Sequence, residues 1–158
     1  MAITTDKKST VFGTFDAAGL YNAPDLAQAN GRIKAVAGRA SNNITNSNGS
    51  KYLLAELPWD VILQPDSAIM TTAWGFAQAV IGVDEATTGL LNVLKATGGA
   101  TGNLPITIFG AKWNKPLWAQ LGLAARPASN VAKLYAYAIA DATIGGDLDF
   151  MLKYANYL

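Results

Sequence analysis

The chain has 158 residues, of which 51% are hydrophobic and only 15% are charged, and its formal net charge is +1 at pH 7. With no cluster of cations and no apolar run near the roughly 20 residues that span a bilayer, we expect neither a nucleic-acid partner nor a membrane partner. The absence of cysteine and histidine excludes disulfides, sulfur-based zinc sites and histidine-containing catalytic triads, so an enzyme would have to use carboxylates or lysines.

Residues 1–30 show neither helical spacing nor strand alternation, and glycines and a proline interrupt each short apolar run. We predict an extended N-terminal arm here and a single domain over residues 31–158. The arm begins without the apolar core of a signal peptide, so synthesis in a cytoplasm is expected. It is too apolar for a solvated tail and is expected to dock either on its own domain or on a neighbouring subunit. The candidate interface residues are Val11, Phe12, Phe15, Leu20 and Tyr21.

From residue 31 onward the apolar residues recur with a period of two, which is typical of β-strands. Strands are predicted over residues 32–40, 51–57, 59–63, 67–73, 75–83, 104–110, 131–141 and 147–158. Pro58 lacks an N–H, so its strand must end, bulge or lie at an edge there. The Asn- and Ser-rich segment 41–50 is predicted to be a long exposed loop. Both faces of 75–83 are largely apolar, which indicates a strand buried on both sides or a strand whose outer face is covered by another subunit. Segment 147–158 has the cleanest alternation.

Two short helices are predicted between the strands. Leucines at helical spacing favour one over residues 84–97, although Gly89 and two threonines weaken its propensity. The second is about two turns long over residues 115–121, with Asn114 as its N-cap and Gly122 as its C-cap.

The second helix is predicted to close the open end of a β-sandwich. Leu117 and Leu121 lie one turn apart on it, with Trp113 and Trp118 beside them. About eight short strands with helices only in the connections predict an all-β protein, an antiparallel β-sandwich. A jelly roll is the first choice of topology and an open Greek-key sandwich is the second.

The tryptophans and two pairs of acids are the candidate ligand-binding or reactive residues. Large aromatic side chains on strands are usually core, and a stacking platform for sugars or bases is the functional alternative. The acids would serve glycoside hydrolysis or calcium binding only if they converge, and otherwise serve solubility. Glycine-rich residues 97–103 lack the ending of a phosphate-binding loop, and Lys7 and Lys8 are expected to be solvated or to meet an acidic surface. The candidates are Trp59, Trp74, Trp113 and Trp118, Asp84 with Glu85, and Asp147 with Asp149.

Four phrases in one order carry a resemblance to a known family. They are YLLAELPWDVIL, WGFAQAVIGV, AKWNKPLWAQLGL and ATIGGDLDFMLKYA. Together they resemble the head-decoration, or cement, proteins of tailed bacteriophages over residues 31–158. The resemblance implies a jelly-roll β-sandwich on the outer surface of the capsid that clamps adjacent capsomers and has no catalytic residues. Pro58, Trp118 and Gly122 match fold positions of that family.

Three hypotheses follow for the function. The first is a structural virion protein, without enzymatic activity or cofactor, that binds the major capsid protein and itself as a homo-oligomer. It would use the arm and one sheet face, and repeated weak contacts would add up by symmetry. The second is a carbohydrate-binding β-sandwich module that uses exposed tryptophans. The third is a histidine-free glycosidase that uses two carboxylates.

Overall fold

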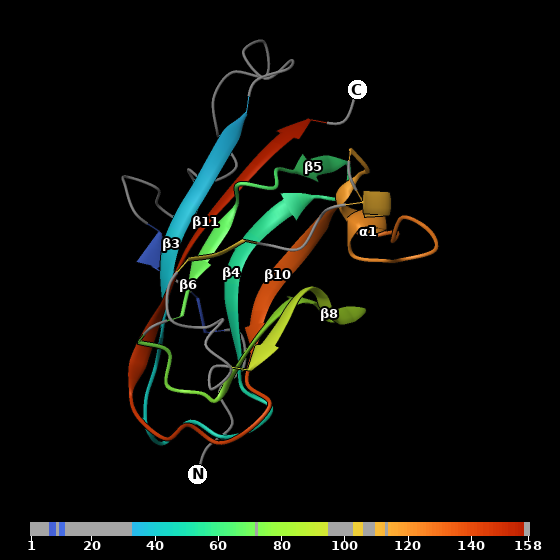
Figure 1. The fold of residues 1–158 in the computed structure, drawn as a ribbon. Helices are drawn as coiled ribbons and strands as arrows, with labels where there is room; N and C mark the ends of the chain where they lie inside the picture. The colour runs from blue at the N-terminus through green and yellow to red at the C-terminus, as the bar shows by residue number, and fades with distance from the viewer. Residues whose placement is uncertain are drawn as a thin grey trace.

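The computed structural model describes residues 7–8, 10–11, 33–71, 73–94, 103–105, 110–112 and 114–156, with the backbone alone at 7–8, 10–11 and 103–105. These residues form two β-sheets (Figure 1). The first sheet has the strand order β1 (Lys7–Lys8), β4 (Lys51–Pro58), β10 (Val131–Tyr137), β7 (Gln78–Val83) and β8 (Ala86–Leu94). The second has the order β2 (Thr10–Val11), β3 (Lys34–Asn42), β11 (Gly146–Asn156), β6 (Ala68–Met70) and β9 (Asn103–Pro105), and β5 (Val61–Leu63) also pairs with β11.

The strand order is that of a jelly roll. Without β1, β2 and β5, the strands in chain order are β3, β4, β6, β7, β8, β9, β10 and β11. One sheet contains the first, eighth, third and sixth of these strands, in the order β3, β11, β6 and β9. The other sheet contains the second, seventh, fourth and fifth, in the order β4, β10, β7 and β8. This arrangement is a pair of interlocked Greek keys, and the prediction of an antiparallel all-β sandwich is confirmed.

The core lies between the sheets and is built by alternation. On β11 the side chains of Leu148, Phe150 and Leu152 are buried, whereas their neighbours along the strand are partly or fully exposed. On β7 the five residues from 79 to 83 are all buried, as expected for a strand covered on both faces. The sequence pattern therefore correctly predicted the buried face of β11 and the burial of both faces of β7.

The predicted helix over 84–97 is wrong, because residues 86–94 form β8. The pairing of β7 with β8 is irregular: Ile81 lies opposite Leu91, and Val83 lies opposite Ala86. One residue of β7 therefore faces four residues of β8, which is a large bulge. The bulge interrupts the alternation of buried and exposed residues, so the adjacent Leu90 and Leu91 are both buried. Together with Leu94 they have the spacing that is typical of a helix, which explains the wrong prediction.

The predicted exposed loop at 41–50 is only partly exposed. Asn42, Asn46 and Ser50 are buried within it. The side chain of Asn42 accepts from the Gly75 amide at 3.0 Å and donates to the Ile144 carbonyl at 2.8 Å. These polar contacts tie the loop to the rest of the sandwich, because a buried amide that lacked them would carry a desolvation cost.

The two ends of the sandwich differ. We call the end formed by residues 43–50 and 138–145 the loop end, and the opposite end the helix end, which carries α1 (Leu117–Gln120) and the 3-10 helix η3 (Gly110–Lys112) (Figure 1). The loop end exposes three isoleucines. They are Ile44, Ile139 and Ile144, with exposed fractions of 55%, 47% and 51%.

Part of the predicted arm pairs with its own domain. β1 pairs in parallel with β4 at one edge of the first sheet, and β2 pairs with β3 at one edge of the second, with Val11 opposite Gly38. Phe12, Phe15, Leu20 and Tyr21 lie outside the described residues, and so do the side chains of Lys7, Lys8 and Val11. The division at residue 30 and the role of these residues as an interface remain predictions.

Candidate functional site

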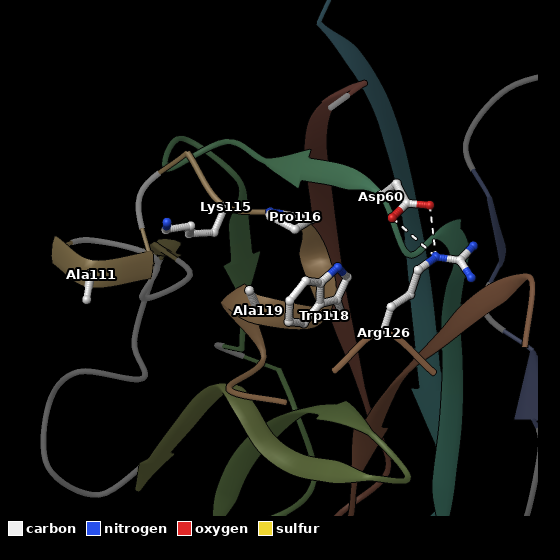
Figure 2. Close-up of a pocket in the computed structure, with 7 residues that line it drawn as sticks. All are labelled: Asp60, Ala111, Lys115, Pro116, Trp118, Ala119 and Arg126. Carbon is white, nitrogen blue, oxygen red and sulfur yellow. Dashed lines mark hydrogen bonds and ion pairs between the residues drawn. The ribbon is translucent and has the colours of Figure 1, made fainter. Parts of the chain in front are cut away.

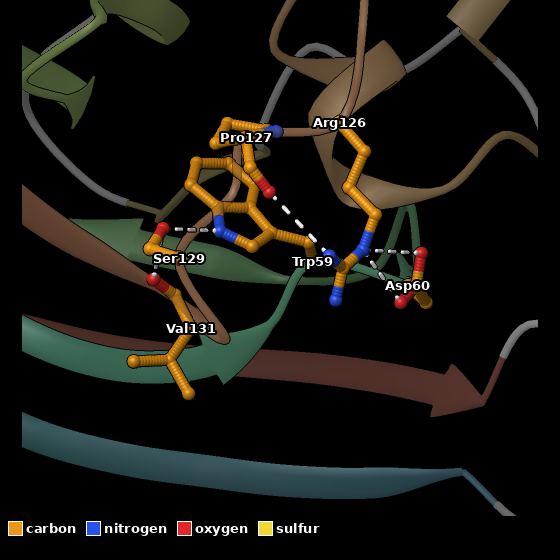
Figure 3. A network of polar contacts seen from close by, with 6 residues as sticks. All are labelled: Trp59, Asp60, Arg126, Pro127, Ser129 and Val131. Atoms are coloured by element: carbon orange, nitrogen blue, oxygen red, sulfur yellow. Dashed lines mark hydrogen bonds and ion pairs between the residues drawn. The ribbon is translucent and has the colours of Figure 1, made fainter.

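The corner between β4 and β5 shapes the helix end. β4 ends at Pro58, as predicted from its missing N–H, and after a turn at 59–60 the chain resumes as β5 in the other sheet. Trp59 in this turn is buried, and its indole N–H donates to the Ser129 hydroxyl at 2.9 Å (Figure 3). The indole therefore closes the core and has its polar atom satisfied.

A second contact joins the same corner to the segment before β10. The guanidinium of Arg126 donates through Nε to both carboxylate oxygens of Asp60, at 2.9 and 3.2 Å, and through Nη1 to the carbonyl of Pro127 at 3.4 Å (Figure 3). Both charged side chains are about half exposed. An ion pair this exposed contributes little stability, but it fixes the position of two charges beside the corner.

Helix α1 is shorter than predicted. It is a single turn whose N-cap is Pro116, with no side-chain cap, because Asn114 has a left-handed backbone (φ 53°) and lies two residues before the cap. The prediction of Asn114 as N-cap is therefore wrong. The C-terminal signal is confirmed: Gly122 has φ 86° just after the capping residue Leu121, and the two bonds of a Schellman motif follow. They run from the amide of 122 to the carbonyl of 119 and from the amide of 123 to the carbonyl of 118.

Two residues of α1 and its C-cap Leu121 are buried. Leu117 and Leu121 lie in the core cluster, which confirms that this segment closes the end of the sandwich. Gln120 is fully buried and bonds to Leu63 of β5. Trp118 departs from the prediction: its indole packs against the core but is only partly buried. Trp113, the other tryptophan that was predicted to help close this end, lies outside the described residues.

The exposed part of Trp118 lines a hollow of about 540 Å³, which we call the Trp118 pocket (Figure 2). Pro116, Trp118 and Ala119 supply its apolar surface. Lys115 and Ala111 lie on one side of the indole, and the Asp60–Arg126 pair lies on the other. This volume is in the range of about 300–1,000 Å³ that is usual for small-ligand sites.

The other sequence-predicted tryptophans are core residues. Trp59 and Trp74 are each about 1% exposed. Trp74 packs edge-on against Tyr52, with ring centroids 5.1 Å apart, and lies 5.0 Å from the ring of Phe76. These rings form an aromatic cluster inside the sandwich, so neither tryptophan offers a stacking platform.

The predicted acid pairs do not form a reactive site. Arg39 lies between Asp147 and Asp149, at 3.5 Å from the first and 2.6 Å from the second, and Ser41 donates to Asp147 at 2.6 Å. Hydrogen bonding with Asp149 and its charge raise the pKa of Arg39. Asp147 and Asp149 therefore form a surface ion cluster with Arg39 on the second sheet.

The second acid pair has its own partners. Asp84 accepts from Lys51 at 3.0 Å and from the Tyr137 hydroxyl at 3.1 Å, and burial, followed by the charge of Asp84, raises the pKa of Tyr137. Asp84 and Glu85 line a smaller hollow of about 240 Å³ beside Lys133. Within the part of the chain that the structure describes, no three acidic side chains gather in a way that could hold a metal ion. No helix in that same part is long and apolar enough to cross a membrane.

The sequence pattern did not predict that Asp60, Lys115 and Arg126 share one site. They come from three separate connections, and no spacing rule brings them together. One signal for Trp118 was present: Leu117 and Leu121 define the buried stripe of the helix, and the next residue after Leu117 is rotated by about 100° away from it.

The fold and site thus define a jelly-roll β-sandwich with a hollow at its helix end. No protein-family model and no curated protein matches the chain. A chain in the solved structure titled "Cyanophage Pam1 capsid asymmetric unit" is similar, with a TM-score of 0.51 and 17% sequence identity. The alignment covers 85% of this chain and 98% of that one. At this identity the likeness shows a shared fold.

Proposed function

We propose that this protein is a structural component of a bacteriophage virion that decorates the outer capsid surface, holds adjacent major capsid protein subunits together and has no enzymatic activity. The observation that carries the proposal is the similarity to a chain of a phage capsid asymmetric unit, which extends over nearly all of that chain. Jelly rolls host many functions, so the fold by itself gives weaker support.

One feature of the described surface and one feature of the sequence support a role in binding protein. The three exposed isoleucines of the loop end lie on segments held by buried polar contacts, such as the bond between Asn42 and Ile144. Exposed apolar side chains on a rigid surface suit a protein partner. The arm adds Phe12, Phe15 and Tyr21 as predicted contacts with a neighbouring subunit.

The competing hypotheses receive less support. A glycosidase would need two free carboxylates on either side of a sugar. Asp84 forms an ion pair with Lys51, and Asp147 and Asp149 form ion pairs with Arg39. The carbohydrate-binding alternative relied on exposed tryptophans among Trp59, Trp74, Trp113 and Trp118. Trp59 and Trp74 are buried and Trp113 lies outside the described residues, so among the described tryptophans only Trp118 keeps an exposed part.

The experiment is cosedimentation of the purified protein with expanded capsids of the encoding phage that lack it. We expect saturable binding at a fixed ratio to the major capsid protein. Replacing Phe12 and Phe15 together by Ser should weaken binding at least tenfold, because each buried phenyl ring contributes about 1.5–3 kcal/mol. The control replaces Ala17 and Ala18 by Ser in the same arm. Failure of the unaltered protein to sediment with capsids would refute the proposal, and an unchanged affinity in the Phe variant would refute the role of the arm alone.

A further inference from the structure

We propose that the Trp118 pocket binds a carboxylated saccharide, with a sugar ring stacked on the indole of Trp118 and the sugar carboxylate held by Lys115. The pocket is lined by residues of α1 at the helix end, whereas segments 43–50 and 138–145, which carry the exposed isoleucines, form the opposite end of the sandwich (Figure 1).

The apolar surface of the pocket suits a flat ring. The indole of Trp118 packs against the core cluster and still lines the pocket, so one part of the ring is supported while another is open. Pro116 and Ala119 add small apolar surfaces beside it (Figure 2). An indole combines a large flat apolar surface with a polar N–H, and the C–H face of a sugar ring surrounded by hydroxyls is complementary to both.

The charges of the pocket favour an anion. Asp60 and Arg126 neutralise each other across 2.9 Å. Lys115 is exposed, and no carboxylate among the described residues pairs with it. The pocket therefore has two cations and one carboxylate, a net charge of +1. A ligand carboxylate would form a charge-assisted hydrogen bond with Lys115.

The opposite wall can recognise hydroxyl groups. Arg126 uses Nε for Asp60 and Nη1 for Pro127, and its guanidinium has further N–H donors. The Asp60 oxygens, each accepting one bond from Arg126, retain lone pairs for a hydroxyl donor. This side therefore offers both donors and acceptors, which sugar hydroxyls require.

The site is held in place before any ligand arrives. Gln120 ties α1 to β5, the Schellman motif ends the helix, and the amide of Trp118 donates to the carbonyl of Trp59 at 3.4 Å. A rigid site loses less conformational entropy on binding. These contacts fix the backbone of the turn that carries Trp118.

A saccharide fits these features better than a protein segment or a nucleic acid. The centres of protein interfaces are depleted of charged residues, whereas charged side chains flank Trp118 on both sides. Nucleic acids need a track of several cations, whereas the lining of this pocket has two, of which Arg126 is paired with Asp60.

The test is calorimetric titration of the full-length protein with an oligogalacturonate and with the methyl ester of the same oligomer, which lacks the charge. The unaltered protein should bind the acid more tightly than the ester, with a change in tryptophan fluorescence. Lys115→Met should weaken binding of the acid about tenfold and leave the ester unchanged, because it removes one charge-assisted bond. Trp118→Leu should weaken both ligands, and Lys133→Met, an exposed lysine outside the pocket, should alter neither.

Three results would overturn the inference: no binding of the acid by the unaltered protein at millimolar concentration, equal affinity for acid and ester, or binding that Lys115→Met does not change. Lys115 is exposed, so its variant remains informative even if Trp118→Leu fails to fold. Capsid cosedimentation of Lys115→Met and Trp118→Leu tests the alternative that the pocket contacts a capsid protein. If they lose capsid binding and no saccharide binds, the pocket is a protein contact, and the proposed function stands while this inference fails.

Discussion

The carboxamide of Gln120 accepts from the backbone amide of Leu63 at 2.9 Å and donates to the carbonyl of the same residue at 3.0 Å. Leu63 lies on β5 opposite Tyr154 of β11. In an antiparallel pair, the N–H and C=O of one residue either both point to the partner strand or both point away from it. Those of Leu63 point to Gln120, so this side chain replaces a missing neighbouring strand and fixes α1 to the sandwich.

Replacing Gln120 by Ala should lower the free energy of unfolding by about 2–4 kcal/mol, because it leaves both backbone groups of Leu63 buried without partners. Gln64→Ala is the matched control: Gln64 is partly buried and its side chain makes one long bond, to the Ile62 carbonyl at 3.3 Å. Its cost should be below about 0.5 kcal/mol. Urea denaturation of the two variants measures the difference, and equal losses would show that Gln120 does not anchor the helix end.

Adjacent glycines at the start of β11 should respond differently to alanine. A Cβ on Gly146 would lie 1.7 Å from the carbonyl oxygen of Ala73, the atom that accepts from the amide of Asp147. Gly146→Ala should therefore cost about 3 kcal/mol or more, or prevent folding. A Cβ on Gly145 meets its nearest atom at 3.5 Å, an ordinary contact, so Gly145→Ala should change the melting temperature little. Similar melting temperatures for the two variants would contradict the close approach at Ala73.

Stability should fall in alkaline solution, in part because of Tyr52. Burial raises the pKa of its hydroxyl from 10.0 to about 12, and this hydroxyl donates to Asn46 at 2.8 Å. Since the pKa is higher in the folded chain, the stabilisation is complete below pH 10 and is lost as the pH rises from 10 towards 12. Tyr52→Phe should reduce the slope of unfolding free energy against pH in this interval. An identical slope in the variant would mean that Tyr52 ionises equally well in the folded chain.

The sequence predicted those parts of the fold in which a local pattern and the tertiary environment agree. β11 alternates strictly, so its buried face was predictable, and the missing N–H of Pro58 marked the end of β4. The β8 region failed because the bulge opposite Gly82 breaks the alternation, and a bulge depends on the partner strand.

The candidate site was less predictable than the fold. The local sequence indicated only that Trp118 lies to one side of the buried helix face defined by Leu117 and Leu121. The approach of Asp60 and Arg126 depends on the turn between β4 and β5, which brings together residues far apart in the chain.

We propose that the chain decorates a phage capsid, and an electron cryomicroscopy reconstruction of capsids mixed with the purified protein tests this proposal. We expect ordered jelly-roll density on the outer surface at symmetry-related positions, in contact with more than one major capsid protein subunit, and absent from capsids without the added protein. A bare shell at saturating protein concentration, or density confined to the interior, would contradict it.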